Sequence, residues 1–177
     1  MRNLLRALFL VTLAALAGCV GIPKGITPVA NFDAQRYMGK WYEIARLEHS
    51  YEKGLSGITA HYSLREDGGI DVVNRGYDAK KKEWRVAQGK AYPVGNPDTG
   101  YLKVSFFGPF YGSYVIFDVD RIGYEYAFVT GPDRRYLWFL SRTPVVTDEV
   151  WTKFIDEAGG LGFDLDKLIR VDQSLSM

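Results

Sequence analysis

The chain has 177 residues, and 22 lysine and arginine residues against 21 aspartate and glutamate residues give it a formal net charge of +1. This near balance argues against a nucleic-acid partner, which would require a strongly basic surface. The single cysteine excludes any intrachain disulfide. Aromatic residues make up 15% of the chain, and this favours a sheet with a large interior surface over a small helical bundle.

The N-terminus has the three parts of an export signal. Its basic start holds Arg2 and Arg6, and an apolar stretch from Leu4 to Leu16 is shorter than the roughly 20 residues that a membrane span needs. Leu16-Ala17-Gly18-Cys19 resembles the bacterial lipobox, in which the signal is removed before the cysteine and the thiol receives a diacylglyceryl group. The alternative is an ordinary secretory signal beside an incidental cysteine. We predict a signal peptide over residues 1–18 and lipidation of Cys19.

Removal of residues 1–18 leaves 159 residues with a formal charge of −1, because the signal holds two arginines and no acid. One domain of this length can bury a substantial core. Residues 19–30, with Pro23 and Pro28, are predicted to be a lipidated tether, and residues 31–177 the folded domain. Val20 favours sorting to the outer membrane, most simply at its periplasmic face.

Alternating apolar and polar residues predict eight strands after the tether. Turn signals separate them, among them Asp67-Gly68-Gly69, Asn96–Gly100 and Gly131-Pro132-Asp133. The predicted strands span residues 41–48, 56–65, 69–76, 83–92, 101–107, 113–120, 124–130 and 135–142. Short connections between eight strands indicate an antiparallel up-and-down β-barrel, an all-β fold.

A helix is predicted over residues 148–158, followed by a short ninth strand from Lys167 to Asp172. Thr147 can cap the helix, and apolar residues recur at helical spacing before Gly159-Gly160. The strand at 135–142 is apolar on both faces, so both faces must be covered. We therefore expect the helix to pack on the outside of the barrel.

Three further features resemble the lipocalin family. Gly39-Lys40-Trp41 matches its Gly-x-Trp motif, Arg142 stands where the family places an arginine, and Asp120 is the one match to its Thr-Asp-Tyr motif. Longer runs, residues 39–46, 103–111 and 131–138, resemble the bacterial subgroup, the outer-membrane lipoproteins related to apolipoprotein D. The resemblance covers nearly all of the predicted mature chain.

The motif residues are expected to close one end of the barrel. In a closed meander of eight strands, the start of the first strand meets the end of the last, so Trp41 and Arg142 become neighbours. A guanidinium over an indole is worth about 0.5–2 kcal/mol. Gly39 and Asp120 fall at the same end, and we interpret all four residues as structural.

The other end is predicted to be the mouth, formed by the connections at 48–55, 77–82, 108–112 and 131–134. Phe107, Phe110 and Tyr111 are expected to crowd it. An exposed aromatic cluster is unfavourable in water, so we expect these rings to have a packing or binding role. The rings either fold back as a lid or core patch, or they contact a ligand.

Alternation also predicts which side chains face the barrel interior. Ala45 is expected among them, and small residues at Ala60, Ala87, Gly89 and Ala91 are expected to leave space that suits a long acyl chain. The predicted ligand contacts are Glu43, Ala60, Tyr62, Asn74, Ala91, Val104, Phe106, Phe110, Tyr111, Tyr114, Tyr136 and Trp138. Glu43 either meets a polar head group or is a buried acid satisfied by tyrosine hydroxyls.

The resemblance implies a carrier or store of fatty acids or lysophospholipids, with no cofactor, and bacterial relatives make a homodimer conceivable. The chain lacks the common hydrolase and metalloprotease motifs, so no enzyme is predicted. His49 and His61 are too few for a metal cage, and we expect His49 to be solvated and His61 to face outward. The rival hypotheses are a tetrapyrrole carrier, a structural or envelope-stress lipoprotein with a filled barrel, and a lipid-modifying enzyme.

Overall fold

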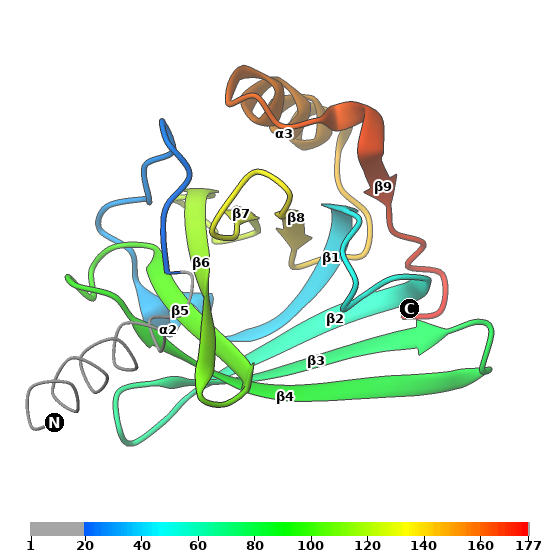
Figure 1. The fold of residues 1–177 in the computed structure, drawn as a ribbon. Coiled ribbons are helices and arrows are strands. Elements are labelled where there is room, and N and C mark those ends of the chain that lie inside the picture. Colours follow the sequence, from blue (N-terminus) through cyan, green and yellow to red (C-terminus); the bar gives the residue numbers. More distant parts are fainter. Residues whose placement is uncertain (1–19, 177) are drawn as a thin grey trace, which may run out of the picture.

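The computed structural model describes residues 20–176, so the predicted signal and Cys19 lie outside the described residues (Figure 1). Nine strands and two α-helices make up the described fold. The strands are β1 (Gly39–Leu47), β2 (Leu55–Leu64), β3 (Ile70–Asp78), β4 (Glu83–Pro93), β5 (Tyr101–Phe107), β6 (Phe110–Val119), β7 (Tyr126–Thr130), β8 (Leu137–Ser141) and β9 (Leu168–Arg170). The helices are α2 (Ala34–Tyr37) and α3 (Asp148–Gly160), with a short 3-10 turn, η1 (Leu165–Lys167), before β9.

The sheet closes on itself. Each of the strands β1 to β7 pairs antiparallel with the next, and β8 pairs antiparallel with β1. β9 extends the sheet beside β1, and α3 lies outside the barrel (Figure 1). The predicted eight-stranded barrel with an external helix and a short ninth strand is confirmed. No helix within residues 20–176 is long and apolar enough to cross a bilayer.

Two apolar clusters occupy the two faces of the barrel wall. The inner cluster includes Trp41 and Tyr62, and the outer cluster lies between the wall and α3. Phe139 of β8 contacts Phe154 of α3 with ring centroids 4.8 Å apart, and Leu137 is fully buried in the same outer cluster. The second apolar face of β8 is therefore covered by the helix, as its sequence predicted.

A β-bulge in β1 shifts the alternation on which the interior was predicted. The β1–β8 register slips between Glu43 and Ala45, so Ala45 joins Ile44 and Leu47 in the outer cluster. The expectation that Ala45 faces inward was therefore wrong, because a bulge adds one residue to one strand and reverses the faces that follow. The bulge also brings Arg46 to the same side as Glu43.

The predicted tether is docked on the barrel over its described length. Val29 donates its amide to the Ile116 carbonyl at 2.9 Å, and its own carbonyl accepts from Gly100 at 2.8 Å. Ile26 is buried in the outer cluster, and Ser113 Oγ donates to the Gly21 carbonyl at 2.5 Å. Residues 20–30 thus form an N-terminal strap that covers apolar outward-facing side chains of the wall, instead of a free linker.

The C-terminal residues join β1 and β2 where the two strands separate. Direct β1–β2 pairing extends only from Gly39 to Tyr42 on β1. Beyond it, Gln173 Nε2 donates to the carbonyls of Glu43 at 2.6 Å and Ile58 at 2.9 Å. The tail therefore replaces the missing strand contacts in the half of the barrel nearer the mouth.

The closed end of the barrel is built around Arg142. Its guanidinium lies 3.8 Å from the centre of the Trp41 ring and donates to the carbonyls of Arg36, Lys40 and Tyr124 at 2.7, 2.9 and 3.2 Å. Arg142 thus ties α2, β1 and the β6–β7 connection to the end of β8.

The other two motif residues support this end in different ways. Gly39 has φ +95°, and a Cβ there would lie 3.4 Å from Arg142 Nη1, so both its conformation and the space favour glycine. The Asp120 carboxylate accepts from the amides of Ile122, Gly123 and Glu125, and so shapes the β6–β7 turn.

Replacing Arg142 with methionine should lower the free energy of unfolding by about 2–4 kcal/mol, because one cation–π contact and three charge-assisted hydrogen bonds are lost. Urea unfolding measures this difference. Lys81→Met is the control, since the Lys81 side chain is 65% exposed and its nearest acid is 3.9 Å away. Equal stability of the two variants would contradict the role given to Arg142.

Candidate ligand-binding site

The half of the interior nearer the closed end is filled by aromatic side chains. The Tyr114 hydroxyl lies 2.7 Å from that of Tyr37 and 2.9 Å from that of Tyr62, and the Tyr37 ring packs 4.8 Å from the Trp41 ring. Burial raises the pKa of all three tyrosines, so the hydroxyls stay protonated and satisfy one another. These rings form the floor of the interior.

Tyr37 belongs to α2, a short helix that the sequence reasoning missed. Asp33 caps this helix by accepting the amide of Arg36, and Trp41 Nε1 donates to the Tyr37 carbonyl at 2.8 Å. The available signal was an Asp at an N-cap position shortly before the Gly-x-Trp motif. A helix of four residues has too little periodicity to detect.

A polar cluster lies near the mouth, where the β1–β2 loop folds into the barrel. Arg46 Nη1 donates to Glu43 Oε1 at 3.1 Å, and Arg46 Nη2 donates to the loop carbonyl of Glu52 at 3.0 Å. Glu52 Oε2 lies 2.9 Å from His49 Nε2 and accepts from Trp138 Nε1 at 3.2 Å. The described partner of Glu43 is therefore Arg46, not a tyrosine hydroxyl.

His49 is enclosed by this cluster, so the prediction of a solvated His49 was wrong. Its side chain is 6% exposed, and its ring lies 5.2 Å from Trp138, 5.7 Å from Tyr136 and 5.8 Å from Tyr51. The loop folds inward because Arg46 holds two of its carbonyls, those of Glu52 and Leu55. His61, in contrast, is exposed on β2, as alternation predicted.

The pKa values of the two buried acids in the cluster are shifted in opposite directions. Burial raises the pKa of Glu43 well above its ordinary value, nearby Glu52 raises it further, and Arg46 opposes both. Burial would also raise the pKa of Glu52, but hydrogen bonds from His49 and Trp138 and the charge of Arg46 outweigh it and lower that pKa. Glu43 therefore tends to hold its proton, whereas Glu52 in the same cluster is ionised.

Strands β3, β4 and β5 supply the accessible part of the interior. Ala91 and Ala87 lie on the same face of β4, yet Ala91 is buried and Ala87 is exposed. Asn74, opposite Ala87 on β3, is half-buried, and its Oδ1 is buried with no hydrogen-bond partner among residues 20–176. Solvent therefore reaches inward-facing positions here, beside an amide oxygen that lacks a partner.

The row of small residues leaves less space than the sequence suggested. A Cβ on Gly89 would lie 2.8 Å from Cδ1 of Phe106 and 2.7 Å from the Ser105 carbonyl oxygen. The Phe106 ring therefore uses the volume that Gly89 vacates. Ala60 and Ala91 are enclosed in the inner cluster, which leaves Ala87 as the exposed member of the four.

The remaining predicted contacts divide between the interior and the outside. Val104, Phe106, Tyr114 and Trp138 are half-buried against the inner cluster. Tyr111 differs from the prediction: it lies two residues from Ser113 on the outward face of β6 and contacts Tyr92 and Lys103. The β5–β6 register turns this ring away from the interior.

Of the two alternatives for the aromatic rings at the mouth, a lid or core patch that folds back over the barrel does not form. Phe107 and Phe110 face each other across the β5–β6 turn and are 71% and 68% exposed. Phe110 begins β6 instead of lying in a loop, because the connection is only Gly108-Pro109. The turn is too short to let these rings reach back into the barrel.

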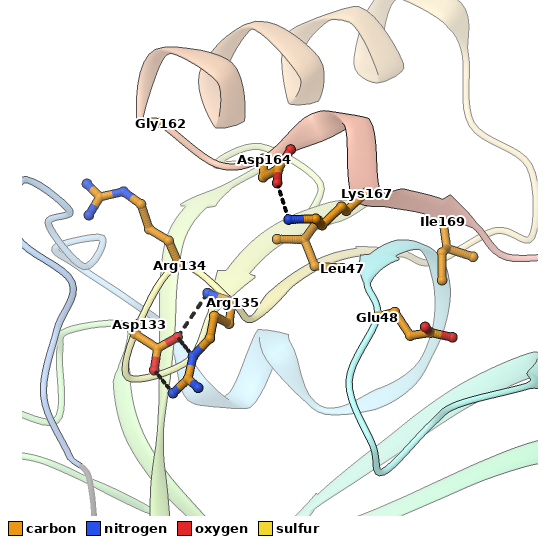
Figure 2. Close-up of a pocket in the computed structure, with 9 residues that line it drawn as sticks. All are labelled: Leu47, Glu48, Asp133, Arg134, Arg135, Gly162, Asp164, Lys167 and Ile169. Carbon is orange, nitrogen blue, oxygen red and sulfur yellow. Dashed lines mark hydrogen bonds and ion pairs between the residues drawn. The ribbon is translucent and has the colours of Figure 1, made fainter.

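A groove of about 850 Å³ lies outside the barrel, between the β7–β8 connection, the end of β1 and the segment around η1 (Figure 2). Its arginines, its lysine and its aspartates already have partners. Arg135 pairs with Asp133 and Lys167 with Asp164, each at 2.6 Å, while Arg134 donates to the carbonyls of Leu161 and Lys24. Most charged side chains of the groove are therefore already paired, which leaves few of them to hold a ligand.

The barrel with one external helix and an arginine-closed end also occurs in known proteins. A family model described as a lipocalin-like domain matches residues 32–173. The chain belongs to the lipocalin family. Its match spans the barrel, α3 and the C-terminal residues that join β1 to β2.

The names of related proteins indicate where in the cell this lipocalin resides. The outer membrane lipoprotein Blc of Vibrio cholerae serotype O1 is 55% identical over 170 residues, covering 96% of this chain and 99% of that protein. The protein of the same name from Escherichia coli (strain K12) is 54% identical over 151 residues, 85% of each chain. Apolipoprotein D of Bos taurus is 31% identical over 182 residues, 93% of this chain and 94% of its own. This lipocalin is a protein of the bacterial outer membrane.

Solved structures share the fold. Insecticyanin from the tobacco hornworm Manduca sexta has a TM-score of 0.68 at 23% identity and covers 86% of both chains. The allergen Per a 4 from cockroaches has a TM-score of 0.68 at 24% identity, covering 87% of this chain and 96% of its own. At these identities the similarity shows the fold alone.

Glu43→Gln should change the pH dependence of stability. Folded Glu43 keeps its proton above the ordinary pKa of 4.5, whereas the unfolded chain releases it. The folded state then binds more protons, so wild-type stability falls as pH rises above about 4.5. The variant should lack this fall, which urea unfolding at a series of pH values measures.

Glu66→Gln removes an exposed acid from the β2–β3 turn and serves as the control. Glu52 is present both in the wild-type chain and in the Glu43→Gln variant, so its contribution largely cancels in the difference. Parallel stability curves for wild type and Glu43→Gln would contradict the raised pKa.

Proposed function

We propose that this lipocalin binds one fatty acid or lysophospholipid in the half of its barrel nearer the mouth, and stores or carries it at the periplasmic face of the outer membrane. The observation that supports this most directly is the accessible interior beside Asn74 and Ala87, above a floor of tyrosines and Phe106. Burial of an acyl chain against these rings contributes roughly 25 cal/mol per Å² of apolar area.

The proposed contacts follow the interior. Apolar positions would enclose the chain, and Asn74 Oδ1 would accept a hydrogen bond from a hydroxyl or protonated head group. The proposed set is Ala60, Tyr62, Asn74, Ala91, Val104, Phe106, Tyr114, Tyr136 and Trp138, with Ala87 added from the structure. Glu43 is left out of this set because Arg46 and the β1–β2 loop enclose it. Binding is passive: the chain leaves water for a largely preformed interior, and the β1–β2 loop borders its entry.

The same geometry argues against catalysis. Glu43, His49 and Glu52 are the obvious acid–base groups, but Arg46, Trp138 and the folded loop enclose them. We therefore propose a binding protein and not an enzyme. Release of free fatty acid on incubation with a lysophospholipid would reverse this assignment.

Ala87→Trp should weaken binding of a labelled oleate about tenfold or more, because an indole would occupy the accessible interior. Gln88→Trp is the matched control: it adds the same ring at the next residue, on the outward face of β4. Fluorescence titration of the polypeptide from Val20 to Met177 measures both. Absence of saturable binding by the unmodified polypeptide would instead favour a structural lipoprotein.

Lipid attachment at Cys19 is the second part of the proposal. Mass spectrometry of the protein from membranes should show a chain that begins at Cys19 and carries a diacylglyceryl group, whereas Cys19→Ser should carry none and keep residues 1–18. A wild-type chain that begins elsewhere, or at Cys19 without acyl mass, would support an ordinary secretory signal. Sedimentation at two protein concentrations tests whether the chain forms the homodimer that the resemblance to bacterial relatives makes conceivable.

A further inference from the structure

The mouth of the barrel presents two large apolar side chains to solvent. Phe107 and Phe110 are 71% and 68% exposed and pair across one tight turn. Tyr51, on the β1–β2 loop at the same end, is 64% exposed. Adjacent exposed rings are unfavourable in water and typically mark a contact with another protein or with a membrane.

The charges on a second turn at the same end of the barrel favour a membrane. The β3–β4 turn, also at the mouth, carries Lys80, Lys81 and Lys82 in succession, all exposed. The nearby acid Asp78 accepts hydrogen bonds from the backbone amides of Lys80 and Lys81 at 3.1 Å. Among the described residues, the turn has one ion pair between a lysine and an acid, Lys81 with Glu83 at 3.9 Å. Lysines near a surface gain about 1 kcal/mol each from anionic lipid, and aromatic rings favour the head-group layer.

The N-terminal strap brings the lipid anchor to the same hairpin. Gly21 is held by Ser113 Oγ on the outer wall, and Ser113 is three residues from Phe110 along β6, about 10 Å at strand spacing. Cys19 precedes Gly21 by two residues, a reach of about 7 Å. The Val20 carbonyl accepts from the Tyr101 hydroxyl, so an acyl group on Cys19 would begin on the outer wall of the β5–β6 hairpin, within about 17 Å of the Phe107–Phe110 turn.

We propose that the β5–β6 and β3–β4 turns form a membrane-docking rim, which places Phe107 and Phe110 in the head-group layer of an anionic bilayer with the barrel mouth facing the lipid. This proposal rests on lipidation of Cys19 as proposed above. It deepens the carrier function, because a chain can then pass between bilayer and barrel without crossing bulk water.

Tryptophan reporters test the rim on the complete lipidated protein. Phe107→Trp places the reporter on the rim, and Ile122→Trp places it in the β6–β7 turn at the closed end, where Ile122 is 90% exposed. Each protein is reconstituted into vesicles of phosphatidylethanolamine and phosphatidylglycerol with brominated acyl chains. We expect quenching and a blue shift for Phe107→Trp and neither for Ile122→Trp, after subtraction of the signal from the wild-type tryptophans.

Equal quenching of the two reporters, or none for Phe107→Trp, would overturn the rim. Phe110→Trp takes its place if Phe107→Trp does not fold. Adding Lys80→Glu, Lys81→Glu and Lys82→Glu should reduce the quenching of Phe107→Trp toward the level of Ile122→Trp. Unchanged quenching would remove the lysines from the rim.

The outcomes separate this proposal from its rivals. Saturable oleate binding with an unquenched Phe107→Trp reporter would leave the carrier function standing and reject the rim. Quenching of Phe107→Trp without oleate binding would support the rim and reject the carrier function. A blue shift of Phe107→Trp that depends on protein concentration, without vesicles, would show that a second copy covers the rings and would overturn membrane docking.

Discussion

The contact between Arg142 and Trp41 is the constraint on which the barrel depends. One guanidinium covers the indole at 3.8 Å and donates to three carbonyls, which come from α2, β1 and the β6–β7 connection. A planar group with several fixed donors can make these contacts together, whereas a lysine ammonium cannot. Because this end is sealed, the tyrosine floor above it is buried, and the exposed inward-facing position Ala87 lies in the opposite half of the interior.

The strands and the closed end were accessible to sequence reasoning, because alternation reports a half-buried wall and the motif residues lie at fixed strand ends. Strand β8 is apolar on both faces, which also predicted that α3 packs on the outside of the barrel, against Leu137 and Phe139. The faces on which individual side chains of the site lie were harder to predict from the sequence. The β1 bulge moved Ala45 outward and Arg46 inward, and nothing in the local sequence marks that extra residue.

Packing between distant segments accounts for the other differences. His49 is enclosed because Arg46 draws the β1–β2 loop inward, and the strap docks because the outer wall offers Ser113 and apolar neighbours. Gly89 suggested empty volume when considered alone, but a ring from the neighbouring strand occupies it. Each of these outcomes depends on a partner outside the local pattern, which periodicity does not report.

The hydrogen bonds of Gln173 have a consequence for the order in which the molecule forms. They join β1 to β2 with a residue that follows β9 along the chain. All the barrel strands therefore leave the ribosome before this seam can be closed. The cylinder is fastened only when the segment after β9 becomes available, so its closure is a late event in folding.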